Sequence, residues 1–182
     1  MTYGVASMTA PLREVALRRP GKSIITAEAS AWNYGKHFDP SKIESEYDRF
    51  VSALENFGVK IHWIKGDDLG NADSVFAYDA SLMTPNGAIL MSPGKEKRRG
   101  EEKLHATFYR SNGIPIIGQI ETPGTAEAGD TLWLDENTML IGRGFRTNTN
   151  GAEQVKDILN SIGIECYIFD LPFYQGRNAC LH

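Results

Sequence analysis

The sequence TAEAGDTLWLDENTMLIGRGFRTNTNGAEQ at residues 125–154 predicts the element from which the rest of the fold can be worked out. Two short apolar runs, 131–134 and 138–141, lie on either side of the turn-forming residues 135–137. Runs of this length separated by polar turn residues are typical of a β-hairpin. We expect a helix to begin near Asn150, shortly after the second strand.

Charged side chains lie at both ends of this hairpin. Glu127 and Asp130 precede the first strand, and Arg143 and Arg146 follow the second. Carboxylates and arginines grouped in this way favour a site for a small ligand that carries both a positive and a negative group. The alternative is that Glu127 and Asp130 are acids of a solvated turn.

The composition is that of an ordinary globular protein. The chain has 182 residues, of which 41% are hydrophobic and 23% charged, and its net charge is -4. This balance argues against a nucleic-acid-coating protein, no apolar run approaches the roughly 20 residues of a membrane span, and the N-terminus does not read as a signal peptide. With two cysteines, Cys166 and Cys180, we expect a single cytoplasmic domain with reduced thiols.

Three helix ends indicate an internal repeat. Gly58, Gly113 and Gly163 follow one another at intervals of 55 and 50 residues, and each precedes a valine or isoleucine that opens a strand. This near-constant spacing predicts units of strand, strand, helix and strand at 1–65, 66–120 and 121–182. The alternative is that helix–glycine–strand junctions occur in any α/β protein.

The expected elements follow from the same patterns of hydrophobic residues and turn signals. Strands are expected at 13–20, 59–64, 73–79, 87–91, 114–120, 131–134, 138–141 and 164–169. Helices are expected from Asp39-Pro40-Ser41 to Gly58, from about Glu96 to Ser111, and from about Asn150 to Gly163, with a loop at 21–39.

Several motifs together resemble the guanidine-modifying (pentein) superfamily of dimethylarginine dimethylaminohydrolases, arginine deiminases and amidinotransferases. They are Glu127-Ala128-Gly129-Asp130, Gly142–Asn148, Gly151-Ala152-Glu153, Asp73–Asp79, Met91–Gly94 with Arg98-Arg99 and Glu101, and Leu181-His182. This resemblance implies a five-bladed α/β propeller of ββαβ units. The expected fold class is therefore α/β, an incomplete propeller of about three such units.

The resemblance also implies site residues, and it implies neither a metal nor a cofactor. Glu127 and His182 would be catalytic, and Asp73, Asp79, Arg98 and Arg146 would bind the substrate. In this family a cysteine thiolate attacks the guanidinium carbon, an amine leaves, and water then releases citrulline. Arg98 and His182 have plain alternatives as well, because Arg98 belongs to a mixed charge run typical of a solvated helix face and His182 is a chain-terminal residue.

Two departures from the family pattern affect the expected function. The family's nucleophilic cysteine would lie beyond His182, and Cys180 does not match it, although 180 and 182 would share one face of a strand. Tyr78 replaces the glutamate of dimethylarginine hydrolases and the arginine of arginine deiminases, which bears on substrate choice. Ala128 for the first glycine of a Glu-Gly-Gly-Asp run is a mild change.

The resulting functional prediction is the N-terminal portion of a hydrolase of the guanidino C–N bond of arginine or methylarginine. Its partners would be a small guanidino substrate and either a second copy of the chain or a complementing C-terminal chain, with no nucleic acid and no membrane. The alternative function is a non-catalytic propeller module similar to translation initiation factor six, which would not need Glu127, Asp79 and Arg146 in the family's arrangement.

Overall fold

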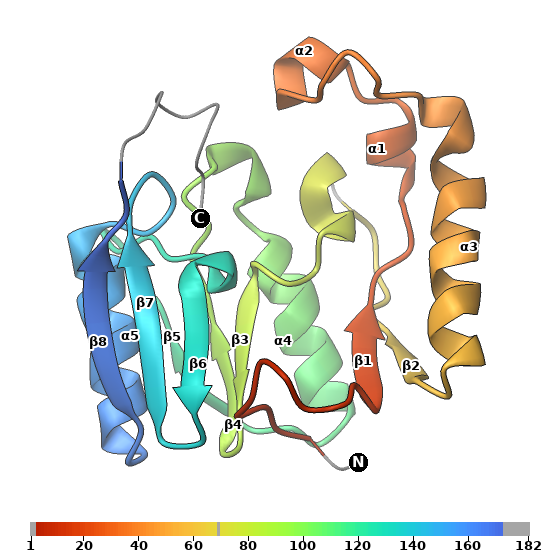
Figure 1. Ribbon diagram of the computed structural model, residues 1–182. Helices are drawn as coiled ribbons and strands as arrows, with labels where there is room; N and C mark the ends of the chain where they lie inside the picture. The colour runs from red at the N-terminus through yellow and green to blue at the C-terminus, as the bar shows by residue number, and fades with distance from the viewer. Residues whose placement is uncertain (1–2, 69, 173–182) are drawn as a thin grey trace. The chain divides into compact units, whose positions relative to one another are not determined.

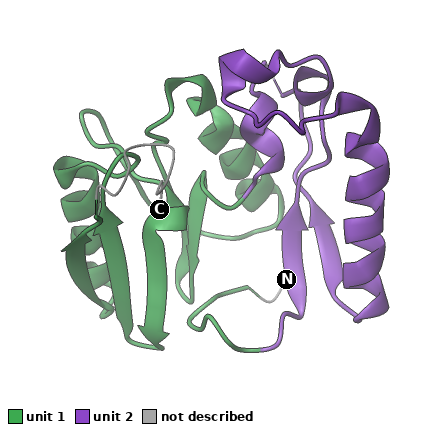
Figure 2. Ribbon diagram, turned by 45° about the horizontal axis from the view of Figure 1, so that its top comes forward, with its two compact units in different colours: residues 1–10, 78–182 green, residues 11–77 purple. Residues whose placement is uncertain are grey.

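A computed structural model describes residues 3–68 and 70–172, and its helices and strands form a mixed α/β fold (Figure 1). The chain divides into two compact units, residues 11–77 and residues 1–10 with 78–182 (Figure 2). The predicted single domain, with internal boundaries after residues 65 and 120, stays a prediction. Within the described residues, none of the helices has the length and apolar character needed to span a bilayer.

Unit 11–77 contains a parallel pair of strands joined by a helical connection. Strand β1 (Glu14–Leu17) runs beside β2 (Lys60–Trp63). Between them lie α1 (Lys22–Ile25), α2 (Ala29–Trp32), the 3-10 turn η1 (Pro40–Lys42) and α3 (Ile43–Asn56). The helix signal is confirmed, because the Asp39 side chain accepts the Ser41 N–H at the start of η1. The loop predicted at 21–39 was wrong in part, since α1 and α2 are single helical turns within it.

The unit of residues 1–10 and 78–182 contains two three-stranded sheets, each formed by a segment with the order strand, strand, helix, strand. The first sheet has β3 (Ser81–Thr84), β4 (Gly87–Leu90) and β5 (Ile116–Gln119), and the second has β6 (Thr131–Asp135), β7 (Thr138–Arg143) and β8 (Glu165–Asp170). Helix α4 (Glu101–Ser111) connects β4 to β5, and α5 (Thr149–Ser161) connects β7 to β8. The hairpin is confirmed, with Thr131 opposite Ile141, and β8 runs parallel to β7.

The glycine helix ends are confirmed as left-handed turns. The φ angles of Gly58, Gly113 and Gly163 are +75°, +67° and +82°. Side chains with a Cβ rarely adopt this conformation, so glycine lets the chain leave each helix and enter the next strand directly.

The strand predicted at 73–79 was wrong. Residues 72–75 form the 3-10 turn η2 (Ala72–Val75), and the strand begins later, at β3. The carboxylate of Asp73 and the hydroxyl of Ser74 are buried and accept hydrogen bonds from within their own unit, which the turn allows. Strand β3 was not predicted, because Ser81 and Thr84 at its two ends are polar but buried and hydrogen-bonded. The usual alternation of exposed polar and buried apolar residues is therefore absent from this strand.

The helix predicted from about Glu96 to Ser111 is interrupted. A 3-10 turn, η3 (Glu96–Arg98), ends at Arg99, and α4 begins after Gly100, whose φ is +104°. This break turns the chain between Arg98 and Glu101 and brings their side chains together.

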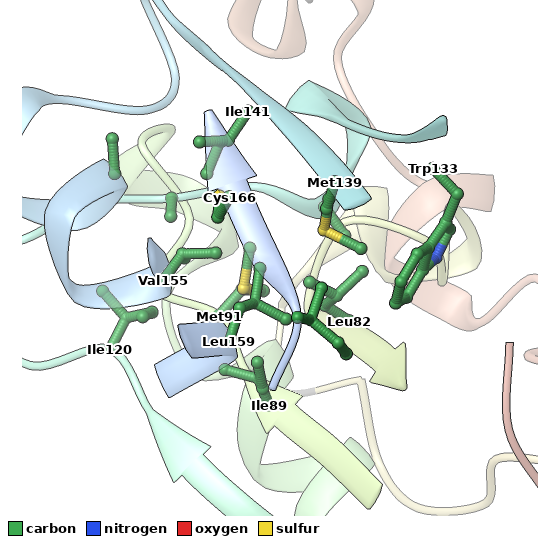
Figure 3. Close-up of a cluster of buried hydrophobic side chains, with 14 residues drawn as sticks. Leu82, Ile89, Met91, Ile120, Trp133, Met139, Ile141, Val155, Leu159 and Cys166 are labelled. Carbon is green, nitrogen blue, oxygen red and sulfur yellow. The ribbon is translucent and has the colours of Figure 1, made fainter. Parts of the chain in front are cut away.

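The core of the unit formed by residues 1–10 and 78–182 lies between its sheets and α5 (Figure 3). Ile89 and Leu82 come from the first sheet and Met91 directly follows β4, while Met139, Ile141 and Cys166 come from the second sheet. Val155 and Leu159 of α5 are fully buried in the same cluster. The opposite side of the second sheet, which we call its outer face, exposes large apolar side chains: Leu132, Leu134, Tyr167 and Phe169.

Candidate functional site

Glu127 is the most deeply buried acid of the predicted site, with a side chain that is 0% exposed. Its Oε1 accepts three hydrogen bonds: from the backbone N–H of Gly94 at 3.0 Å, from the N–H of Lys95 at 3.3 Å, and from Nη1 of Arg146 at 3.2 Å. Donors of this kind fix the direction of the carboxylate. The alternative of a solvated turn acid is therefore excluded for Glu127.

Two loops approach each other closely to make these contacts. A Cβ on Gly94 would lie 2.4 Å from the carbonyl oxygen and 2.8 Å from Cα of Arg146. Real Cβ atoms do not come this near to backbone, so only glycine fits at position 94. The Pro93-Gly94 loop and Arg146 can thus reach one carboxylate from two directions.

Asp79 is anchored to the segment that carries Glu127. Its carbonyl oxygen accepts the N–H of Ala128 at 3.1 Å, and its Oδ1 accepts the N–H of Gly129 at 3.1 Å. Asp79 and Glu127 are therefore both fixed relative to the 3-10 turn η4 (Ala128–Asp130). Two carboxylates anchored to one short turn suit a planar cation that offers several N–H donors, such as a guanidinium group.

Arg98 lies between two carboxylates and not on a solvated helix face. Its Nη1 donates to Oδ2 of Asp79 at 2.5 Å, and its Nη2 donates to Oε2 of Glu101 at 2.8 Å. Burial acts to lower the pKa of Arg98, but the hydrogen bonds and charges of Glu101 and Asp79 outweigh it, so that the pKa is raised. Arg98 is thus a permanent cation that orients Asp79. Its predicted contact with the substrate stays a prediction.

Asp130, the second acid of the hairpin motif, is also buried. Its Oδ2 accepts the hydroxyl of Thr147, and that hydroxyl in turn accepts the backbone N–H of Glu127 at 3.2 Å. Asp130 therefore orients the Glu127 backbone through Thr147, a different role from a turn acid that bonds only its own backbone.

Asp73 belongs to the other unit, 11–77. It lies in η2 with a side chain that is largely buried, and its Oδ1 accepts the hydroxyl of Tyr34 at 2.6 Å. The ring of Tyr34 packs against Phe38, with ring centroids 4.5 Å apart. The predicted role of Asp73 in binding the substrate stays a prediction.

An apolar hollow adjoins the turn that carries the site. It has a volume of about 420 Å³ and its walls include Tyr78, Gly129 and Asp130. The remaining lining is mainly apolar: Met8, Thr131, Leu132, Leu140, Ile141, Gly142, Phe169 and Leu171. Tyr78, the departure noted in the sequence, is half exposed at this hollow. A ligand with an apolar stem fits such a lining better than a fully polar one.

Two residues of the prediction, His182 and Cys180, lie outside the described residues. Two other histidines make local contacts. His62 contacts Glu14, and Nδ1 of His105 bonds the Ser81 hydroxyl at 2.8 Å. In residues 3–68 and 70–172 there is no cluster of three or more histidine, cysteine or acidic side chains with metal-site geometry.

Cys166 is expected to be unreactive. It is buried on β8, and burial raises the pKa of its thiol to about 11, against 9.0 for a free thiol. Because the thiolate is the reactive form, alkylation of Cys166 by iodoacetamide at pH 8 should be about 100-fold slower in the folded than in the denatured chain. Peptide mapping by mass spectrometry separates Cys166 from Cys180. Equal rates in the two states would contradict the burial of this thiol.

Sequence reasoning missed three contributors to the site. Glu101 was quoted only as part of a motif, although it forms the inner contact of Arg98. Thr147 links Asp130 to Glu127, and the backbone N–H groups at 94 and 95 bind the Glu127 carboxylate. Only the Pro-Gly dipeptide gave a signal, because glycine allows close backbone approach.

Several known proteins resemble this chain over most of its length. Residues 29–175 match a family model described as N,N dimethylarginine dimethylhydrolase, eukaryotic. The N(G),N(G)-dimethylarginine dimethylaminohydrolase of Pseudomonas aeruginosa is 33% identical over 152 residues, which are 84% of this chain and 58% of that protein. The protein of the same name from Streptomyces coelicolor is 28% identical over 159 residues, again 84% of this chain and 58% of the relative. The chain thus spans less than two thirds of the length of either relative.

Solved structures give the same result. A variant of the Pseudomonas aeruginosa enzyme in complex with citrulline has a TM-score of 0.75 and 31% identity, over 91% of this chain and 63% of that one. The N-terminal domain of a cyanobacterial arginine dihydrolase has a TM-score of 0.71 over 87% of this chain and 58% of that one, and at 16% identity it shows a likeness of fold alone. The resemblance to the guanidine-modifying superfamily is confirmed. With the family model matching residues 29–175, the chain belongs to the N,N-dimethylarginine dimethylhydrolase family.

Proposed function

We propose that this chain supplies the substrate-binding and acid–base residues of a hydrolase that cleaves the guanidino C–N bond of arginine or methylarginine. The observation that carries the proposal is the fixing of Asp79 and Glu127 to one turn, each with defined hydrogen-bond donors. Guanidinium is protonated at physiological pH, so paired carboxylates are the groups that would bind it.

In the proposed reaction a cysteine thiolate attacks the guanidinium carbon and the C–N bond to the amine breaks. His182 donates a proton to the leaving amine and then takes one from the water that releases citrulline. Glu127 and Asp79 would bind the guanidinium group throughout, while Arg146 and Asp73 would bind the carboxylate and the amino group of the substrate. The thiolate would come from a segment beyond His182, in the same or a complementing polypeptide.

We further propose that the sheets are part of a five-bladed propeller, completed by that segment or by a second copy in the cytoplasm. The outer face of the β6–β7–β8 sheet supports this, because Leu132, Leu134, Tyr167 and Phe169 are exposed there and apolar side chains gain from being covered. Sedimentation of the chain as a stable monomer at micromolar concentration would contradict the second-copy arrangement.

Titration calorimetry with L-arginine, N,N-dimethylarginine and L-citrulline tests the proposed function. We expect saturable binding of guanidino ligands, and no citrulline release by residues 1–182 alone because the thiolate is supplied elsewhere. Failure of every ligand to bind would contradict the guanidino site. Citrulline release that survives the combined Cys166→Ala and Cys180→Ala changes would contradict the proposed source of the thiolate.

A further inference from the structure

Glu101 is a buried carboxylate to which the proposed reaction gives no part. It occupies the first position of α4, and its side chain is 1% exposed. Both of its oxygens accept from Nε of Arg98 at 3.1 Å, and Oε2 also accepts from Nη2 at 2.8 Å. One edge of the Arg98 guanidinium is thus bound by Glu101 in a two-point contact.

The other side of Arg98 faces Asp79. Its Nη1 donates to Oδ2 of Asp79, whose side chain is 14% exposed, against 5% for Arg98 and 1% for Glu101. The three side chains therefore form a row that runs from the interior toward solvent in the order Glu101, Arg98, Asp79. The row contains two carboxylates and one guanidinium, so its net charge is -1.

Without Glu101, Arg98 would neutralise Asp79, and a positively charged ligand would gain little by approaching that carboxylate. Glu101 offsets the charge of Arg98 from the inner side and leaves the row negative at its exposed end. We propose that Glu101 is a positioning residue that acts through Arg98 to keep Asp79 able to bind a guanidinium cation. This inference rests on the proposed function, since it names the group that makes the same site selective for a cation.

The test compares two ligands of nearly the same shape that differ in charge, L-arginine and the neutral L-citrulline. In Glu101→Gln the row becomes neutral, so the dissociation constant for arginine should rise about tenfold, while that for citrulline should change less than about twofold. Calorimetry on the full chain measures both. Glu96→Gln is the matched control, because it removes one negative charge from an exposed position of the same segment and should leave the ratio of the two constants unchanged.

A structural role for Glu101 would weaken both ligands equally, and that result would overturn the inference. Glu101→Asp keeps the charge with a shorter side chain and decides the matter if the glutamine variant does not fold. If the ratio of the dissociation constants for citrulline and arginine in Glu101→Asp stays within about twofold of the wild-type ratio, the inference is supported. An about tenfold fall of that ratio would overturn it. Wild-type chain that binds neither ligand would instead overturn the proposed function itself.

Discussion

Gly151→Ala is expected to lower the free energy of unfolding by about 3–5 kcal/mol, a large effect for the addition of one methyl group. A Cβ at position 151 would lie 1.9 Å from the carbonyl oxygen and 2.5 Å from the carbonyl carbon of Thr125, both backbone atoms. Alanine in a helix is otherwise favoured over glycine by about 1 kcal/mol. The steric conflict outweighs this preference and makes the substitution destabilising.

This position is rigid because α5 begins directly against residue 125. Asn148 caps the helix by accepting the Gly151 N–H at 2.7 Å, and the same oxygen accepts the Thr125 N–H at 3.1 Å. The Asn148 N–H returns a bond to the Thr125 carbonyl at 3.0 Å. An added methyl group must break this set of bonds, and residue 125 lies two positions before Glu127, so the site would be displaced as well.

Urea denaturation followed by circular dichroism measures the effect of Gly151→Ala. Gly35→Ala is the control, because a Cβ there has no atom within 4 Å and the change should be nearly neutral. Equal stability of the two variants would show that α5 can shift away from residue 125, contrary to the packing described here.

Glu127→Gln should reduce the affinity for L-arginine at least about 100-fold, if the proposed function holds. The amide oxygen can still accept the bonds from Gly94, Lys95 and Arg146 that the structure gives to Oε1. The fold should therefore survive, with the melting temperature changed by only a few degrees, about 1 kcal/mol of stability. What disappears is the buried negative charge that would face the guanidinium group.

Calorimetry with arginine, next to a thermal melt of the same sample, separates these two expectations. Glu153→Gln provides the control, since Glu153 is exposed on α5 and its loss changes the net charge by the same amount. Undiminished arginine binding by Glu127→Gln would remove Glu127 from the proposed site. Loss of folding would instead show that the charge on Glu127 stabilises the two loops around it.

The elements that could be predicted from sequence are those whose signals are local. The hairpin around residues 135–137 and the turns at Gly58, Gly113 and Gly163 depend on nearby residues alone, and all are confirmed. The misplaced strand at 73–79 and the missed β3 depend on distant partners. Ser74 bonds Arg18, and Ser81 bonds Tyr109, so buried polar side chains look exposed in a hydrophobicity pattern.

The candidate site likewise contains residues that could be predicted from the sequence and contacts that could not. Glu127, Asp79 and Arg146 were predicted as site residues from motif resemblance, and the structure places all three around the loops that surround η4. Arg98 was also predicted as a site residue, but its buried pairing with Glu101 could not be anticipated, because both residues belong to a run of charges that usually lies in water. Their burial follows from the left-handed turn at Gly100, which no periodicity reveals.

The alternation of side chains along β8 makes Cys166 a reporter of strand alignment during folding. Cys166 lies beside Met139, and Tyr167 beside Leu140, so one side of the strand is buried and the other is open. A chain that folds with β8 displaced by one residue would bring the thiol to the open side and bury Tyr167 instead. Pulse labelling of the Cys166 thiol during refolding would therefore measure the fraction of molecules in which β8 is misaligned. Measurements of total helix or strand content do not distinguish these molecules from native ones.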